Sequence, residues 1–411
     1  MPCQEPGLLA KRTWAIAPSV DVLRRRWIAL INSSDKEKNN LLKVTNSRDI
    51  DSSSPAIPRQ PHSSRRLREE RGQNPNIVPF SYRSFDRQFL ILDPRVIDRP
   101  SANLWQVTGP YQVYATEPSS NVIDDGPALT FAPLVPDMHH YQGHHAGRVL
   151  PLYRSADDQS PNIAPGLLEH LTRLLGHSVT GEDVLAYVAA VVAHSGYTDR
   201  YREDLEIPEV RVPITRDCLL WDRAVHLGRE IIWLHTFGER FHNSDEGRPR
   251  TTPRLPDSET PRIESPIPYT EDEMPDTVAY DAAAESLVIG ATGRVAPVPA
   301  SVWGYNVSGM RVVRKWISYR LKRPRGRAPE SPLNLINATT WTHEFNDDLL
   351  DLLHVLGRLV RLDPNRPISS RKSYTTRLVT LEELREAGIL PASKSAQAPP
   401  RPTRSSIQLA L

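Results

Sequence analysis

Short apolar runs bounded by Pro, Gly or Asp predict strands in two parts of this 411-residue chain. In the first part, we predict strands at Phe89–Leu92, Val113–Ala115 and Ala128–Val135, because such runs between turn-forming residues are typical of strands. In the second part, apolar residues return at Leu287–Val298 and Val302–Val307. The pattern therefore predicts two clusters of short strands rather than one long sheet.

Apolar residues spaced three or four apart predict helices between and after these clusters. Thr180 with Asp183 three residues later resembles a capping box, and Asp217 is placed to cap another helix. Val312–Leu321 can also be helical, with Arg311, Arg314, Lys315 and Ser318 outward. The other predicted helices are Trp14–Leu30, with Arg24, Arg25 and Arg26 on its polar side, Ile163–Leu175, Asp183–Ala193, Cys218–Leu234 and Phe345–Leu359.

The order of these elements predicts an α+β fold, with a strand-rich segment, a helical middle segment, a second strand cluster and C-terminal helices. Residues 32–76 are rich in Ser, Asn, Lys and Arg, so we expect little structure there. The expected division is a poorly structured part at 1–76, strands then helices at 77–241, a Pro-rich linker or loop at 242–275, a second structured part at 276–391 and a disordered tail at 392–411.

Composition limits where a charged ligand could bind. The chain has 51 Lys and Arg against 49 Asp and Glu, so a surface for a polyanion must be local. Cys3 and Cys218 have no metal-binding spacing, which favours a reducing compartment. No apolar run is long enough to span a membrane and no signal peptide is evident, so we expect a cytoplasmic protein without membrane contact.

A local surface of this kind is predicted at residues 302–327. Four aromatic residues alternate there with eight basic ones, and no acid occurs from Gly309 to Arg327. Aromatic anchors with Arg and Lys are typical of nucleic-acid binding, whereas a plain solvated charged face is the alternative. The basic residues are Arg311, Arg314, Lys315, Arg320, Lys322, Arg323, Arg325 and Arg327.

Two further clusters allow more than one function. Asp86, Asp93 and Asp98 lie among Arg83, Arg87, Arg95 and Arg99. Structural Arg–Asp pairs are favoured over an acid–base pair, and spare arginines could still contact phosphate. A second cluster has the residue types that bind Zn²⁺. It lies in a Gly-containing segment that we expect to be a loop, and a loop holds ligands less firmly than a helix does. A polar surface loop is therefore the favoured interpretation. This cluster consists of Asp137, His139, His140, His144 and His145.

Segments in one order along the chain resemble the C-terminal specificity region of type ISP restriction–modification enzymes. They include SYRSFDRQFLILDPRVIDRP, LWQVTGPYQVY, PDMHHYQGHHAGRVLPLYR, VLAYVAAVVAHSGYTDRY, VPITRD, GREIIWLHTFGERF and VWGYNVSGMRVVRKWISYR. The resemblance implies double-stranded DNA as the partner. It also implies that residues 1–76 are the remnant of a preceding methyltransferase region.

The resemblance does not extend to catalysis. No nucleotide loop, nuclease motif or adenine-methyltransferase motif occurs in the sequence. We therefore expect no catalytic, cofactor or metal residue here. AdoMet, ATP and Mg²⁺ would bind in domains absent from this chain, which a separate methyltransferase, helicase and nuclease polypeptide could supply.

The sequence thus predicts binding of double-stranded DNA as the specificity part of such an enzyme. The predicted DNA-binding residues are Arg311, Arg314, Lys315, Arg320, Lys322 and Arg323, with Arg83, Arg87, Arg95 and Arg99 in second rank. Two alternatives remain open at this point, namely a metal-dependent hydrolase using the loop from His139 to His145, and an inactive gene fragment.

Overall fold

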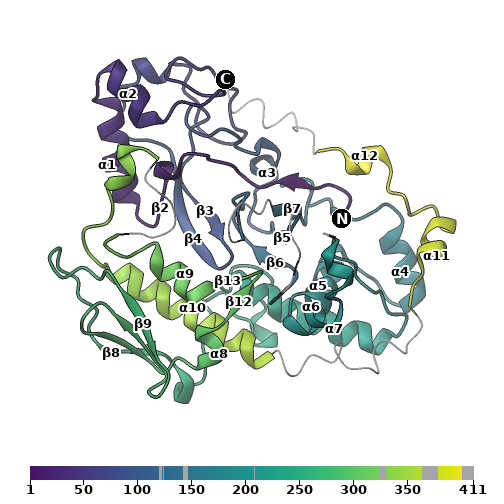
Figure 1. The fold of residues 1–411 in the computed structure, drawn as a ribbon. Coiled ribbons are helices and arrows are strands. Elements are labelled where there is room, and N and C mark those ends of the chain that lie inside the picture. The colour runs from purple at the N-terminus through teal and green to yellow at the C-terminus, as the bar shows by residue number, and fades with distance from the viewer. Residues whose placement is uncertain are drawn as a thin grey trace.

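The structure is a computed structural model of the chain. It describes residues 1–119, 123, 125–141, 147–207, 209–323, 330–362 and 378–399. Within these residues, small antiparallel sheets combine with helices, which confirms the predicted α+β class (Figure 1). None of the described helices is both long enough and apolar enough to cross a membrane.

The N-terminal part is built on a three-stranded sheet of order β2-β4-β3. Its strands are β2 (Ile16–Ala17), β3 (Ile77–Arg83) and β4 (Asp86–Ile91). Strands β3 and β4 form a hairpin in which Phe80 lies opposite Gln88. Around this sheet lie α1 (Val20–Ile31), α2 (Asp35–Leu42) and the 3₁₀ turns η1 (Thr13–Ala15) and η2 (Leu67–Glu69).

The first 76 residues are more ordered than their composition indicated. Ser34 and Glu37 form a capping box at the start of α2, and Ile50, Ile57 and Leu67 are buried in one core with α1. The arginine Arg26 is also buried, because its guanidinium donates hydrogen bonds to three backbone carbonyl groups. The expectations of a poorly structured segment and of Arg26 on a polar helix face were therefore wrong.

A second sheet, of order β1-β7-β5-β6, joins the N-terminus to the middle of the chain. The first strand pairs with β7 in the register Glu5 to Val149. A short helix, α3 (Ala102–Gln106), precedes β5. The strands of this sheet are β1 (Glu5–Pro6), β5 (Tyr114–Pro118), β6 (Thr130–Ala132) and β7 (Gly147–Pro151).

The helical middle segment follows its sequence signals closely. The capping box of Thr180 and Asp183 starts α5, and the Asp217 carboxylate accepts from the Leu220 N–H at the start of α7, so both predicted caps are confirmed. In α7, Gly228 lies against the backbone of α5, where an added Cβ would sit 1.7 Å from the Ala186 oxygen. The helices here are α4 (Leu167–Leu175), α5 (Gly181–Val192), α6 (Ser195–Arg200), η3 (Asp204–Glu206) and α7 (Cys218–His235).

The second strand cluster is a four-stranded sheet of order β8-β11-β10-β9. The predicted strand at Leu287–Val298 is a hairpin, because Gly290 with φ +65° turns the chain between β10 and β11. One strand of this sheet, β8, comes from the predicted linker, which also contains η4 (Ser244–Glu246) and η5 (Asp257–Glu259). The strands are β8 (Arg262–Ser265), β9 (Val278–Asp281), β10 (Ser286–Ile289) and β11 (Gly293–Ala296).

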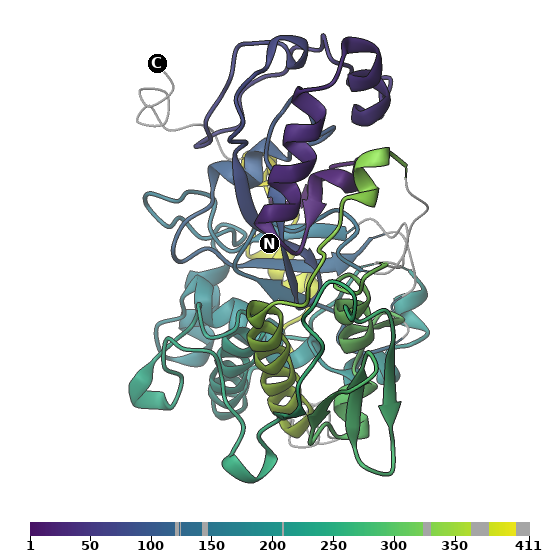
Figure 2. The ribbon, with the colours of Figure 1, turned by 90° about the vertical axis from the view of Figure 1, so that its left-hand side faces the viewer.

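The C-terminal part places a long helix at the centre of the lower half of the molecule. Helix α10 (His343–Leu362) contacts both α7 and α8 (Ala300–Trp303), and Figure 2 shows it between the α5–α7 helices and the β8–β11 sheet. The predicted strand at Val302–Val307 is replaced by α8 and the start of a hairpin. Beyond α10 the structure describes α11 (Leu381–Glu386) and α12 (Lys394–Gln397), whereas 400–411 of the predicted tail lie outside the described residues.

Candidate nucleic-acid interface

The basic segment folds as a hairpin followed by a short helix. Strands β12 (Asn306–Val307) and β13 (Met310–Arg311) pair around a turn at Ser308 and Gly309, both with positive φ, and α9 (Val312–Ser318) follows. The apolar positions of the segment are buried, as the helical pattern predicted. They are Val312, Val313, Trp316, Ile317 and Leu321.

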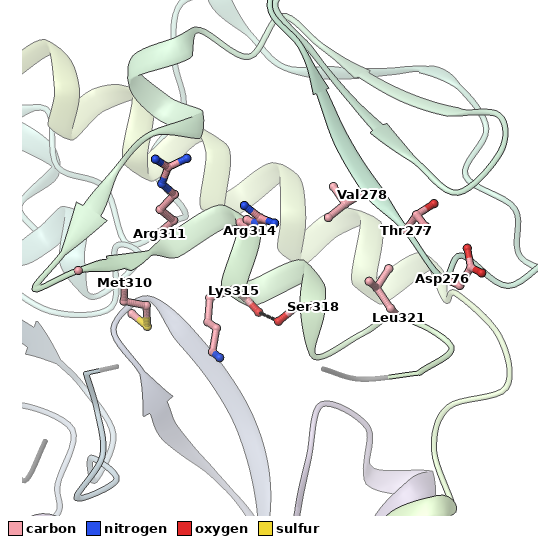
Figure 3. Close-up of a pocket in the computed structure, with 10 residues that line it drawn as sticks. Asp276, Thr277, Val278, Met310, Arg311, Arg314, Lys315, Ser318 and Leu321 are labelled. Carbon is pink, nitrogen blue, oxygen red and sulfur yellow. Dashed lines mark hydrogen bonds between the residues drawn. The ribbon is translucent and has the colours of Figure 1, made fainter. Parts of the chain in front are cut away.

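Burial of these apolar positions turns the intervening cations outward. Arg311 and Arg314 are exposed, while Lys315 and Ser318 are partly buried. Figure 3 shows the guanidinium groups of Arg311 and Arg314 on one side of the segment, with Lys315 extending away from them. The pattern of apolar and polar positions therefore sets which cations of α9 reach solvent.

These residues border a surface pocket of about 420 Å³ (Figure 3). One wall comes from β13 and α9, and the other from the segment that leads into β9, with Asp276, Thr277 and Val278. That second wall is fixed to the first, because the Lys322 backbone N–H donates to the Pro275 oxygen at 2.7 Å. The pocket is thus a groove between two segments that are about forty residues apart in sequence.

The cations that line this pocket, and Arg323 after it, have no carboxylate partner among the described residues. In the part of the chain that the structure describes, no ion pair within 4.0 Å involves Arg311, Arg314, Lys315 or Arg323. The Lys322 ammonium donates to the Glu271 and Asp272 backbone oxygens at 3.1 and 3.2 Å. Burial, followed by repulsion from Arg83, lowers the pKa of Lys315. Unpaired surface cations keep their full attraction for an external anion.

Arg320 belongs to the interior instead. It is 2% exposed, its guanidinium donates to the Asp86 carboxylate at 2.9 Å, and it stacks on the Trp316 ring at 3.5 Å. Helix α9 ends at Ser318, and Arg320 follows four residues after Trp316, so its side chain lies on the buried side of the segment. The structure therefore contradicts the prediction that Arg320 contacts phosphate.

The second-rank arginines are mostly engaged in ion pairs. Arg95 is buried and pairs with Asp93 at 2.6 Å and with Glu70 at 3.0 Å, so it too cannot reach DNA in this structure. Arg87 pairs with Glu239 and donates to a backbone carbonyl. Only Arg99, of these four, is exposed. The expected Arg–Asp pairing is confirmed for Arg95 with Asp93.

The other pairs connect residues far apart in sequence. Arg83 pairs with Asp137 at 3.0 Å, and Asp98 pairs with Arg12 rather than with a neighbouring arginine. Neither partner carries a local sequence signal, so sequence reasoning missed them. The same holds for Asp276 and Thr277, which reach the pocket only because their segment is tied to residue 322.

The histidine cluster is not assembled as a metal site in the described residues. No group of three or more His, Cys, Asp or Glu suited to a metal occurs among them. His140 is buried, and burial lowers its pKa to about 3. The Asp137 carboxylate, a candidate ligand, is occupied by Arg83 and by the His139 backbone N–H at 2.8 Å. His144 and His145 lie outside the described residues.

The fold and the exposed cations thus define a protein with a surface suited to a polyanion. A family model described as the type ISP C-terminal specificity domain matches residues 1–352, and the chain belongs to this family. No curated protein matches the chain.

Three of the solved structures that match the chain are similar to it as follows. A cryo-EM structure of a DrdV–DNA complex matches with TM-score 0.60 and 16% identity, covering 89% of this chain and 36% of that one. A nuclease-deletion mutant of the type ISP enzyme LlaGI in complex with a DNA substrate mimic matches with TM-score 0.53 and 16% identity, covering 89% of this chain and 27% of that one. The ATP-dependent type ISP enzyme LlaBIII bound to DNA matches with TM-score 0.58 and 14% identity, covering 89% of this chain and 23% of that one. The chain therefore spans well under half the length of these proteins.

Proposed function

We propose that this chain binds double-stranded DNA as the target-recognition part of a type ISP restriction–modification enzyme. The observation that carries the proposal is the group of cations around α9 for which the described residues supply no carboxylate partner. Membership of the specificity-domain family supports it, as does a fold shared with three proteins whose structures contain DNA.

In this proposal the residues differ in their roles. Arg311, Arg314, Lys315 and Arg323 contact phosphates and fix the position of the protein on the duplex, since such contacts carry no sequence information themselves. Arg99 is a second-rank phosphate contact because it is exposed. Lys322 contributes less, since its ammonium is held by two backbone carbonyl groups. Arg83, Arg87, Arg95 and Arg320 stabilise the fold.

A salt series with duplex DNA tests the proposal. Each phosphate contact contributes about −0.9 to the slope of log K against log salt concentration. The variants Arg311→Ala and Arg314→Ala should each make the slope shallower by about this amount and weaken binding to all sequences alike. Binding is measured by fluorescence anisotropy of a labelled duplex.

The control is Arg223→Ala, which removes an exposed arginine from helix α7, on another part of the molecule. The control should keep the wild-type slope. An equal change of slope in the control would show that the effect is one of net charge and not of the pocket. No affinity of the wild type at low salt would favour the inactive-fragment alternative.

Catalysis is not assigned to this chain. We propose that AdoMet, ATP and Mg²⁺ act in other regions of the enzyme, whether these lie on a separate polypeptide or not. We also keep the cytoplasm as the proposed location, because DNA is the proposed partner.

A further inference from the structure

Lys315 lies where α9 meets the hairpin of β3 and β4, and no carboxylate of the described residues lies within 4.0 Å of its ammonium. The charged groups that act on it are Arg83, which repels it, and Asp86, which attracts it. Each is already engaged, since Asp86 pairs with Arg320 at 2.9 Å and Arg83 pairs with Asp137 at 3.0 Å. Within the described residues, Lys315 is therefore a cation without an ion-pair partner, because the charged groups next to it pair with other residues.

The side chain of Lys315 is also held in place. Its ammonium lies 5.1 Å from the centre of the Tyr319 ring, and that ring packs on Tyr82 at 5.3 Å. The Arg83 guanidinium stacks on the other aromatic ring of this pair, Tyr82, at 3.8 Å. Two cations and two tyrosines thus form one packed group, which restricts the conformations available to Lys315.

This arrangement is unfavourable in the protein alone. Partial burial removes water from a charged group, and a like charge nearby adds repulsion, so both effects disfavour the ammonium form. Both effects lower the pKa of Lys315, with burial the larger. A group that costs stability in the free protein is typical of a site whose ligand supplies the missing interaction.

The ligand that fits is an anion, and the pocket has room for one. Lys315 lines the same pocket of about 420 Å³ as Arg311 and Arg314, which are exposed and unpaired in the described residues. Asp276, on the opposite wall, is the acid among the lining residues. A tetrahedral phosphate group, with its charge and several acceptor oxygens, matches a partly buried lysine ammonium whose neighbouring charges are already paired.

We propose that Lys315 forms the centre of a preformed phosphate subsite in this pocket. Its charge destabilises the free protein and stabilises the protein that has phosphate bound. The phosphate is a DNA phosphodiester if the proposed function holds, and this part of the inference rests on that function. Free inorganic phosphate shares the chemistry and can occupy the subsite without DNA.

The first experiment compares Lys315→Met with Arg314→Met in thermal unfolding without ligand. Met keeps the packing of the alkyl chain on Tyr319 and removes the charge. The Lys315→Met variant should unfold at the wild-type temperature or above it, because the uncompensated charge is gone. Arg314→Met, from an exposed position, should leave the temperature unchanged.

The second experiment uses two ligands with the wild type and Lys315→Met. Inorganic phosphate, against chloride at equal ionic strength, should raise the unfolding temperature of the wild type by roughly 1–3 °C and leave that of the variant unchanged. With duplex DNA, the variant should bind about tenfold or more weakly at a fixed salt concentration, as expected for a partly desolvated charged contact.

The outcomes separate the two proposals. If phosphate stabilises only the wild type but no form binds DNA, the subsite stands and the proposed DNA function fails. If Lys315→Met unfolds several degrees lower and binds DNA as the wild type does, Lys315 is a structural cation and the inference is overturned. Equal stabilisation of both forms by phosphate also overturns it.

Discussion

The buried pair of Asp86 and Arg320 allows the sharpest test of how α9 is held. Its two side chains are 3% and 1% exposed, and it joins strand β4 to the residue that follows the last turn of α9, 234 positions further along the chain. We consider the substitution Asp86→Asn, which keeps the size of the side chain and removes its charge. Arg320 then remains buried without a carboxylate in hydrogen-bonding distance among the described residues, although Asp348 still attracts it from further away.

The magnitude follows from what the carboxylate does. Asp86 accepts from the Arg320 guanidinium at 2.9 Å and from the Gln88 amide at 2.7 Å. Hydrogen bonds to charged groups contribute about 1.5–3 kcal/mol each, and breaking a buried pair by removing one partner costs about 3–5 kcal/mol. Arg320 keeps its bond to the Trp316 oxygen at 3.0 Å and its stacking on that ring, so we expect a loss of about 3–4 kcal/mol.

The assay is urea unfolding followed by tryptophan fluorescence, combined with hydrogen exchange of the α9 amides. The double variant Asp86→Leu with Arg320→Met removes both charges, and it should lose less stability than Asp86→Asn alone. A change of less than about 1 kcal/mol in the unfolding free energy of Asp86→Asn would show that the carboxylate is not needed to keep Arg320 buried. A double variant that loses the sum of the two single losses would show that the two side chains do not act as a pair.

Two further predictions concern the pH dependence of stability and the packing of the helices. Because the pKa of His140 is lowered by burial to about 3, the unfolded chain takes up a proton below pH ~6.5 that the folded chain does not. The contribution of His140 to the free energy of unfolding is therefore fully present above that pH. It is lost as the pH decreases, by about 2 kcal/mol at pH 5. His140→Gln should reduce the difference between urea midpoints at pH 7.5 and pH 5, and an unchanged difference would contradict this origin. Gly228→Ala should destabilise by about 1–3 kcal/mol, because its Cβ would lie 1.7 Å from the Ala186 oxygen and push α5 and α7 apart. A rise in the unfolding temperature, as helix propensity alone predicts, would show that the helices adjust without cost.

The outcome at the basic segment shows how far sequence reasoning reaches. The apolar spacing correctly assigned Val312, Val313 and Trp316 to the core and placed Arg311 and Arg314 outside. Sequence reasoning failed at Arg320, two residues beyond the end of α9. Arg320 lies four residues after the buried Trp316, and a buried acid from a distant strand, Asp86, pairs with its guanidinium.

The N-terminal 76 residues show the same limit. Their polar composition indicated disorder, yet strand β2 pairs with β4 and a few apolar residues share a core with α1. Arg12 and Arg26 are buried there because backbone carbonyls and Asp98 meet their guanidinium donors. Composition counts charged residues, but it does not show which of them find partners in the folded chain.

Features that depend on residues within a few positions of one another could be predicted from the sequence. These include the caps at Thr180 and Asp217, the helices that they start, the α+β order and the apolar face of α9. Local backbone geometry fixes these features, because helical and strand periods relate neighbouring residues. Folding was needed to show which arginines pair, that Arg320 is buried, and that Lys315 has no carboxylate partner among the described residues. Burial and ion pairing depend on residues that folding brings together, and no local pattern encodes those distances.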